Sequence, residues 1–289
     1  MQPIIIPDTV NYIAVFLTLE CNLRCSYCIN RFGSFAPVNG QMSGEEWVTA
    51  LNRIVTREDI PVTLQGGEPT LHPDFNFIVN NVRADTHIDL LTNLEFDIGK
   101  FIAGVDPERM KRNAPYASIR ISYHPESMKL VALLDKVMSL QNAGYSVGVW
   151  GILHPEYVNQ VHLAAQYCKH LGVDFRTKEF LGEHKDKLFG TFSYPGSCDR
   201  QERREVMCRS SELIIGPNGG VYRCHSDLYG GRSPFGNILD PDFEFESRFR
   251  RCTAYGHCNP CDVKAKTNRF QISGHTAVEI RKGKNSAIL

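Results

Sequence analysis

The sequence has no surplus of charge, because 32 lysine and arginine residues balance 32 aspartate and glutamate residues. A nucleic acid or an acidic membrane surface attracts proteins with a basic surplus, so neither is predicted as a partner. No apolar run approaches the roughly 20 residues of a membrane-spanning helix. The start, MQPIIIPDTVNYIAVF, lacks the cationic segment and cleavage site of a secretion signal. These absences predict a cytoplasmic protein without a membrane anchor.

Cysteine, in contrast, is abundant, with ten in a chain of 289 residues. In a reducing compartment, clustered cysteines more often bind metal or take part in chemistry than form disulfides. Three of them lie within residues 21–28, two stand apart, and five fall between residues 208 and 261. This distribution predicts two separate thiolate sites.

Apolar runs alternate with helical patterns in the first part of the chain, as is typical of βα units around a parallel sheet. Residues 43–46, SGEE, predict a capping box at the start of one helix. Further helices are expected over 127–142, ended by Gly144, and around the apolar face that carries Val161 and Cys168. The expected strands are 12–19, 62–65, 88–92, 118–123, 146–153 and 173–178.

This alternation predicts the α/β class and a partial (β/α)6 barrel. Past Leu181 the helical periodicity fades, and glycine, proline, cysteine and charged residues dominate. We therefore predict a barrel domain over residues 1–185 and a small cysteine-rich domain over residues 186–289.

Cys21, Cys25 and Cys28 directly follow the apolar segment YIAVFLTLE, so their thiols are expected at the carboxyl end of the first strand. In α/β barrels and open sheets, that edge carries the active site. A [4Fe–4S] cluster normally takes four thiolates. Only three occur here in tight spacing, which would leave one iron open to chelate S-adenosylmethionine. A three-cysteine zinc site and three incidental thiols are the alternatives.

The C-x3-C-x2-C spacing, with an aromatic residue before the last cysteine, resembles the signature of the radical S-adenosylmethionine superfamily. About 40 residues later, QGGEPT ends the second expected strand and is similar to the GGEP segment of that family. The resemblance implies two cofactors, S-adenosylmethionine and a [4Fe–4S] cluster held by Cys21, Cys25 and Cys28.

The resemblance also implies which residues contact S-adenosylmethionine. Many relatives continue with Leu-Asp-Gly after the serine of the fourth strand, where this chain has YHP, so the chain departs from the family at that point. The apolar segment around residue 153 could form a wall of the adenine site, but an ordinary core strand would explain it equally well. The implied contacts are Tyr27 near the adenine, Gly66, Gly67 and Glu68 at the methionine amine, Ser122 at the ribose or carboxylate, and Leu153 in the apolar wall.

The later cysteines flank a predicted hairpin, LIIGPNGGVYRC, and a C-x2-C pair. This arrangement resembles the auxiliary-cluster region of SPASM and twitch enzymes. Because no cysteine follows Cys261, the shorter twitch form, with a second [4Fe–4S] cluster, is favoured. Cys252 or Cys198 could replace one ligand, and a zinc site on the same thiolates is the alternative. The implied ligands are Cys208, Cys224, Cys258 and Cys261.

The resemblance implies an enzyme that forms a 5′-deoxyadenosyl radical, which abstracts hydrogen from the substrate. We expect a small polar substrate, such as a sugar or aminocyclitol, that is dehydrogenated or epimerised. His124 and Lys178 are the candidate proton acceptors, and Cys198 and Cys252 are the candidate hydrogen-atom donors. Flavodoxin or ferredoxin is the expected reductant.

Two alternatives remain. The first is a peptide- or protein-modifying enzyme, a crosslinking enzyme or maturase, although a triad that begins at residue 21 is expected to leave no room for a leader-binding module. The second is a non-catalytic iron–sulfur electron carrier. A carrier would ligate all four irons and would have no use for a GGEP turn.

Overall fold

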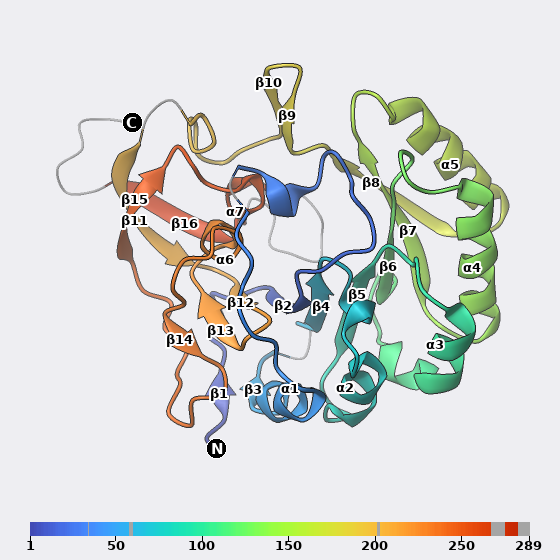
Figure 1. Cartoon of the computed structure of the whole chain (residues 1–289), viewed down its shortest axis with the longest axis horizontal. Helices are drawn as coiled ribbons and strands as arrows, with labels where there is room; N and C mark the ends of the chain where they lie inside the picture. The colour runs from blue at the N-terminus through green and yellow to red at the C-terminus, as the bar shows by residue number, and fades with distance from the viewer. Residues whose placement is uncertain (34, 58–59, 201–202, 267–274, 283–289) are drawn as a thin grey trace.

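The fold is organised around a nine-stranded sheet, as a computed structural model of residues 1–33, 35–57, 60–200, 203–266 and 275–282 shows (Figure 1). Neighbouring strands from β12 to β8 run parallel, and the hairpin strands at the β14 edge run antiparallel. In sheet order, the strands are β14 (Gly236–Asn237), β13 (Gly220–Tyr222), β12 (Leu213–Ile215), β2 (Ile13–Thr18), β4 (Val62–Gly66), β5 (Ile88–Thr92), β6 (Ile119–Tyr123), β7 (Val147–Leu153) and β8 (Asp174–Glu179).

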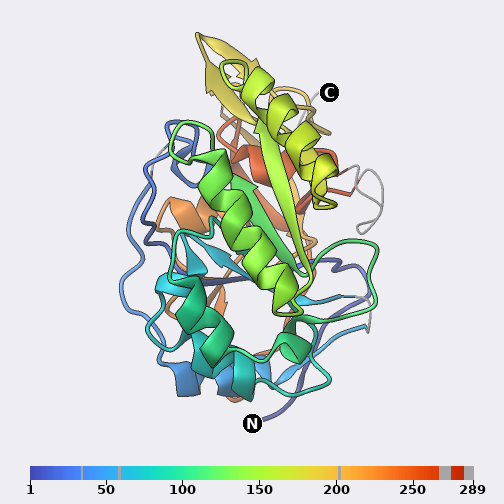
Figure 2. The ribbon, with the colours of Figure 1, turned by 90° about the vertical axis from the view of Figure 1, so that its right-hand side faces the viewer.

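Helices cover one face of the parallel strands, and Figure 2 shows α3, α4 and α5 side by side on that outer face. Their apolar sides pack on alternate strand residues, such as Ile119, Ile121 and Val149, in one large core. No helix in the described residues is long and apolar enough to cross a bilayer. The helices are α1 (Gly44–Leu51), α2 (Phe75–Asn81), α3 (Ile98–Gly104), α4 (Leu130–Asn142) and α5 (Val158–His170), with 3-10 turns η1 (Ile29–Arg31), η2 (Pro69–Leu71) and η3 (Pro107–Met110).

The strand order confirms the predicted α/β class, and an open sheet of βα units is compatible with a partial barrel. All the predicted barrel strands are present, with ends within one residue of the predicted ones. The capping box also forms, because the Ser43 side chain accepts from the Glu46 amide while the Glu46 carboxylate accepts from the Ser43 amide.

A second, smaller sheet lies beside the barrel and consists of antiparallel strands in the order β15-β11-β16. The predicted β12–β13 hairpin is present, but β12 also pairs with β2, so residues on either side of the predicted boundary near 185 share one sheet. The further elements are β11 (Arg204–Ser210), β15 (Arg250–Tyr255), β16 (Val278–Lys282), α6 (His225–Tyr229), α7 (Pro260–Val263), and the pairs β1 (Ile4–Ile5) with β3 (Ile54–Val55) and β9 (Gly182–His184) with β10 (Lys187–Phe189).

Candidate active site

The three cysteines of the N-terminal triad lie on the loop that leaves the carboxyl end of β2. All three are partly exposed and unpaired in disulfides. The Cys28 amide donates to the Cys25 carbonyl at 3.3 Å, and the Leu23 amide lies 3.4 Å from Cys21 Sγ. The loop therefore presents three thiols at the edge of the sheet where parallel strands place active sites.

The Gly66–Gly67 turn at the end of β4 packs directly against this loop. The Gly67 amide donates to the Thr18 carbonyl at 3.0 Å, and the Glu68 amide donates to the Glu20 carbonyl at 2.8 Å. Gly66 has a φ of +148°, and a Cβ on either glycine would lie 2.0 Å from a backbone oxygen of the β2 loop. Only glycine permits this approach, so the turn fixes the backbone from which the triad begins.

We expect Gly67→Ala to destabilise the protein by about 2–3 kcal/mol, because the new methyl group meets a backbone carbonyl that cannot move aside cheaply. Urea unfolding would measure this. The matched control is Gly172→Ala, where φ is +70° but no atom lies within 4 Å, so only the backbone strain of about 1 kcal/mol applies. Equal losses in the two variants would contradict a close packing of the turn on the loop.

Glu68 is fully buried. Its carboxylate accepts hydrogen bonds from the Thr70 hydroxyl at 2.6 Å, from the Thr92 hydroxyl at 2.9 Å and from the Asn93 amide at 2.7 Å. Burial raises the pKa of this carboxyl group, and the hydrogen bonds oppose that shift. The side chain therefore anchors the turn to β5, and the backbone of the turn is the part that faces the triad loop.

An aromatic cluster surrounds Tyr27, which lies between Cys25 and Cys28 in the triad loop. The Tyr27 ring stacks on His154 with ring centroids 4.9 Å apart, and the Tyr27 hydroxyl lies 3.2 Å from His124 Nδ1. The Ser26 amide and hydroxyl both donate to Glu126, which ties the loop to the segment after β6. Burial lowers the His124 pKa to about 4, so this imidazole is neutral at pH 7. A pKa this far below 7 makes the imidazole a weak proton acceptor.

The register of β6, β7 and β8 shows which residues face the interior of the barrel, on the side opposite the helices. Ser122 pairs with Trp150, and Ile152 pairs with Lys178 on that same face. Leu153 pairs with Glu179 on the other face. Strand alternation thus makes Ile152, rather than the predicted Leu153, the apolar residue that this strand presents inside the barrel.

A second group of thiols lies beside the small sheet and lines one cavity. Cys252 on β15 pairs with Val206 on β11, and Cys208 lies two residues further along β11, so both thiols occupy the same face of this sheet. Cys224 at the start of α6 and Cys258 after β15 complete the set. Arg232 and Asp262 also line the cavity.

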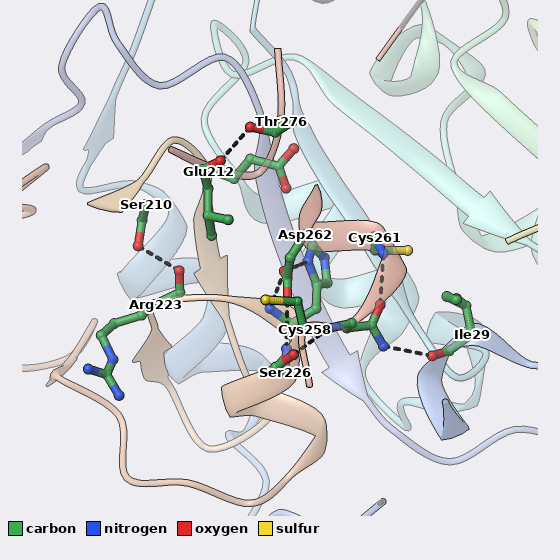
Figure 3. A network of polar contacts seen from close by, with 12 residues as sticks. Ile29, Ser210, Glu212, Arg223, Ser226, Cys258, Cys261, Asp262 and Thr276 are labelled. Carbon is green, nitrogen blue, oxygen red and sulfur yellow. Dashed lines mark hydrogen bonds and ion pairs between the residues drawn. The ribbon is translucent and has the colours of Figure 1, made fainter. Parts of the chain in front are cut away.

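Cys261 faces elsewhere. It does not line this cavity, and Figure 3 shows the thiols of Cys258 and Cys261 pointing to opposite sides. Burial raises the Cys261 pKa, and Lys264 opposes the shift. Cys198 is buried and donates to the Cys258 carbonyl at 3.3 Å.

Asn259, which begins α7, connects the two thiol sites (Figure 3). Its carboxamide oxygen accepts from the Cys261 amide at 2.9 Å, and its Nδ2 donates to the Ile29 carbonyl, next to Cys28, at 3.0 Å. Its own amide donates to the Ser226 hydroxyl at 2.5 Å. This role could not be predicted from the sequence, because an asparagine inside a C-x2-C pair carries no signal for a partner 230 residues away.

The donor sets fit iron–sulfur clusters. Burial raises the pKa of the Cys25 thiol to about 12, so this thiol stays protonated until a metal displaces the proton. Within the described residues, no three cysteine, histidine or acidic side chains converge closely enough to hold a single ion. A cluster binds each thiolate through a different iron and does not need such convergence.

Comparisons with known proteins agree with this geometry. Residues 15–129, which include the triad and the Gly66–Gly67 turn, match the family model of the radical SAM superfamily. The chain contains a radical SAM domain. This family uses a [4Fe–4S] cluster and S-adenosylmethionine, and auxiliary clusters are common in it, so the cofactor predictions are confirmed.

Several proteins are similar to parts of this chain. GTP 3′,8-cyclase of Listeria monocytogenes is 35% identical over 61% of this chain and 51% of its own length. The mycofactocin maturase MftC of Mycobacterium tuberculosis is 25% identical over 51% of this chain and 49% of its own. The chain therefore spans about half the length of these relatives. A solved structure of native anSMEcpe with bound AdoMet and Kp18Cys peptide has the same fold, with 16% identity, a TM-score of 0.54, and coverage of 79% of this chain and 78% of that one.

Proposed function

We propose that the protein is a radical SAM enzyme that abstracts hydrogen from a small polar substrate inside the barrel. Cys21, Cys25 and Cys28 would hold the SAM-binding cluster, which when bound supplies the electron that cleaves S-adenosylmethionine to methionine and a 5′-deoxyadenosyl radical. The observation that carries this proposal is the packing of the Gly66–Gly67 turn against the triad loop, with bonds of 3.0 and 2.8 Å between the two backbones.

The surrounding residues would bind S-adenosylmethionine. Tyr27 offers an aromatic face, Ser122 a hydroxyl on the inner surface, and Ile152 an apolar contact. Because the Glu68 carboxylate is already fully hydrogen-bonded, we assign the methionine amine to the backbone carbonyls of the glycine turn and give Glu68 a positioning role.

The second cluster would be held by the four thiols that line the cavity beside the small sheet. This set retains Cys208, Cys224 and Cys258 from the sequence prediction and takes Cys252 in place of Cys261. With Cys252 engaged as a ligand and Cys198 buried, neither is well placed to donate a hydrogen atom to a substrate.

The chemistry that fits these residues best is dehydrogenation. A carbinol carbon loses a hydrogen atom to the radical, its hydroxyl proton passes to a base, and one electron leaves to an acceptor of the iron–sulfur class, which gives a carbonyl. His124 and Lys178 are the candidate proton acceptors, and the Lys178 pKa of about 7 suits this role better than the His124 pKa of about 4.

A peptide or protein substrate is the second candidate. It is favoured by the likeness to a maturase and by the shared fold with a structure that contains a bound peptide. The expected product distinguishes the two candidates, because a peptide crosslink joins two residues whereas a dehydrogenated small molecule gains a carbonyl.

The test is anaerobic turnover in deuterated water with S-adenosylmethionine and dithionite. We expect 5′-deoxyadenosine to form, and a carbonyl product to appear with a mixture of candidate small molecules. Solvent deuterium at an inverted carbon would show epimerisation instead, since an exchangeable thiol would have returned the atom. The absence of 5′-deoxyadenosine from cluster-loaded protein would contradict the proposed function.

A further inference from the structure

One acidic side chain reaches the triad loop from a different part of the barrel. Ser26 lies directly after Cys25, and both its backbone amide and its hydroxyl donate to the Glu126 carboxylate, at 2.7 and 2.8 Å. The two bonds end on different carboxylate oxygens, so they fix the orientation of the carboxylate as well as its position. The chemistry proposed above makes no use of this contact.

A tight turn after β6 holds Glu126 in place. The Ser127 and Met128 amides both donate to the His124 carbonyl, at 3.0 and 2.9 Å, and close the turn around Glu126. The Glu126 carboxylate also accepts a hydrogen bond from the Tyr157 hydroxyl at 3.4 Å. The turn and Tyr157 therefore position this carboxylate independently of the triad loop.

Two neutral asparagines hold the triad loop elsewhere. Asn22 donates to the Glu95 carbonyl at 2.6 Å, and Asn93 donates to the Asn22 side chain at 2.7 Å. Asn93 Nδ2 also lies 3.7 Å from Cys21 Sγ, within the range of a hydrogen bond to sulfur. These contacts position the loop without adding charge, whereas Glu126 brings a carboxylate to the edge that carries the three thiols.

We propose that Glu126 is a positioning residue that lowers the reduction potential of the cluster on the triad. This inference rests on the proposed function, because it takes the triad as the site of the SAM-binding cluster. Reduction adds one electron to the cluster, and a nearby anionic carboxylate makes that addition less favourable. A cluster with a lower potential is, once reduced, a stronger electron donor to the sulfonium of S-adenosylmethionine.

The hydrogen bond from the Ser26 amide acts in the same direction. An amide that donates to a cluster sulfur stabilises the added electron and raises the potential, because the positive end of the N–H dipole faces the cluster. In this structure the Ser26 amide donates to Glu126 instead. Loss of the carboxylate would remove a negative charge and free this donor, and both changes raise the potential.

The first measurement needs no cluster. In the metal-free full chain, hydrogen exchange of the Ser26 amide, read by fragmentation mass spectrometry, reports its bond to Glu126. We expect Glu126→Ala to speed this exchange at least about tenfold, as the loss of a hydrogen bond to a charged group predicts. Glu126→Gln keeps an oxygen acceptor and should show a smaller increase. Equal exchange in the parent protein and Glu126→Ala would overturn the proposal.

The second measurement is a redox titration of the cluster-loaded protein, followed by electron paramagnetic resonance. The signal that disappears when the three triad cysteines are replaced by alanine belongs to the triad cluster. Glu126→Gln is expected to raise the midpoint potential, so that the ratio of reduced to oxidised cluster at a fixed potential increases at least about threefold. The matched control is Glu156→Gln, because Glu156 is an exposed acid after β7 that pairs with Lys185 at 3.3 Å.

Glu156→Gln should keep the parent potential. An unchanged potential in Glu126→Gln, or an equal rise in Glu156→Gln, would overturn the proposal. Glutamine retains an acceptor for the Ser26 amide, so a merely structural role of Glu126 would leave the potential where it is.

The 5′-deoxyadenosine assay on the same samples separates this inference from the proposed function. Parent protein that forms 5′-deoxyadenosine, with an unchanged potential in Glu126→Gln, would support the function and contradict the role of Glu126. Parent protein that forms none, with a potential that still rises in Glu126→Gln, would contradict the function and leave the effect of Glu126 on the cluster standing.

Discussion

Replacing Cys21, Cys25 and Cys28 together by alanine is expected to abolish 5′-deoxyadenosine formation. The parent protein, reconstituted anaerobically, should hold about eight irons on two [4Fe–4S] clusters, and the triple variant about four. The reason is geometric, since the three thiols share the one loop that leaves the carboxyl end of β2. Iron analysis and chromatography of the dithionite-reduced reaction would measure both quantities.

Cys168→Ala is the matched control for this prediction. Cys168 lies on the buried face of α5 in the apolar core, so its loss should leave the iron content and the cleavage of S-adenosylmethionine unchanged. Full cleavage activity in the triple variant would show that another site binds S-adenosylmethionine.

The barrel was predictable from the sequence because its signals are local. Each parallel strand is a short apolar run, and buried strands of this kind stand out from the helical patterns between them. Ser43 and Glu46 show the same principle, since a capping box spans only four positions and its bonds form wherever the helix begins.

The pairing of β12 with β2 was not predictable in this way. The segment around Ile214 reads as a hairpin strand, and nothing in its composition shows that it adds to a sheet edge formed two hundred residues earlier. Parallel pairing between distant segments is decided by the packing of the whole domain, which a local pattern does not contain.

Local sequence patterns also failed to predict the full roles of Glu68 and Cys261 within the site. Motif spacing placed Glu68 beside the triad correctly, but its burial and its bonds to Thr92 and Asn93 depend on the neighbouring strand. For Cys261, spacing from Cys258 suggested a shared site, whereas the orientation of the two thiols depends on how α7 is capped and packed (Figure 3).

The ligand set of the second cluster leads to a prediction with an equally large effect. Cys252→Ala is expected to leave about four irons per chain, and Cys261→Ala about eight. Cys252 shares a sheet face with Cys208, and both line the cavity with Cys224 and Cys258. Iron and sulfide analysis, with electron paramagnetic resonance of the reduced protein, would count the clusters in each variant.

The packing of α7 is the reason that Cys261 is not expected to replace Cys252. Asp262 accepts hydrogen bonds from the His225 amide at 2.7 Å and the Ser226 amide at 3.0 Å, while Asn259 holds the Cys261 amide. Turning the Cys261 thiol into the cavity would require α7 to rotate and these bonds to break, and bonds to a buried carboxylate contribute about 1.5–3 kcal/mol each.

Cys208→Ala is the comparator. Cys208 is a predicted ligand and lines the cavity together with Cys252, so this variant should lose the second cluster in the same way as Cys252→Ala. Neither variant affects the triad, so S-adenosylmethionine should still be cleaved while product formation stops for want of an electron acceptor. Loss of four irons from Cys261→Ala, with or without a loss from Cys252→Ala, would instead establish the C-x2-C pair as ligands and require α7 to turn when the cluster binds.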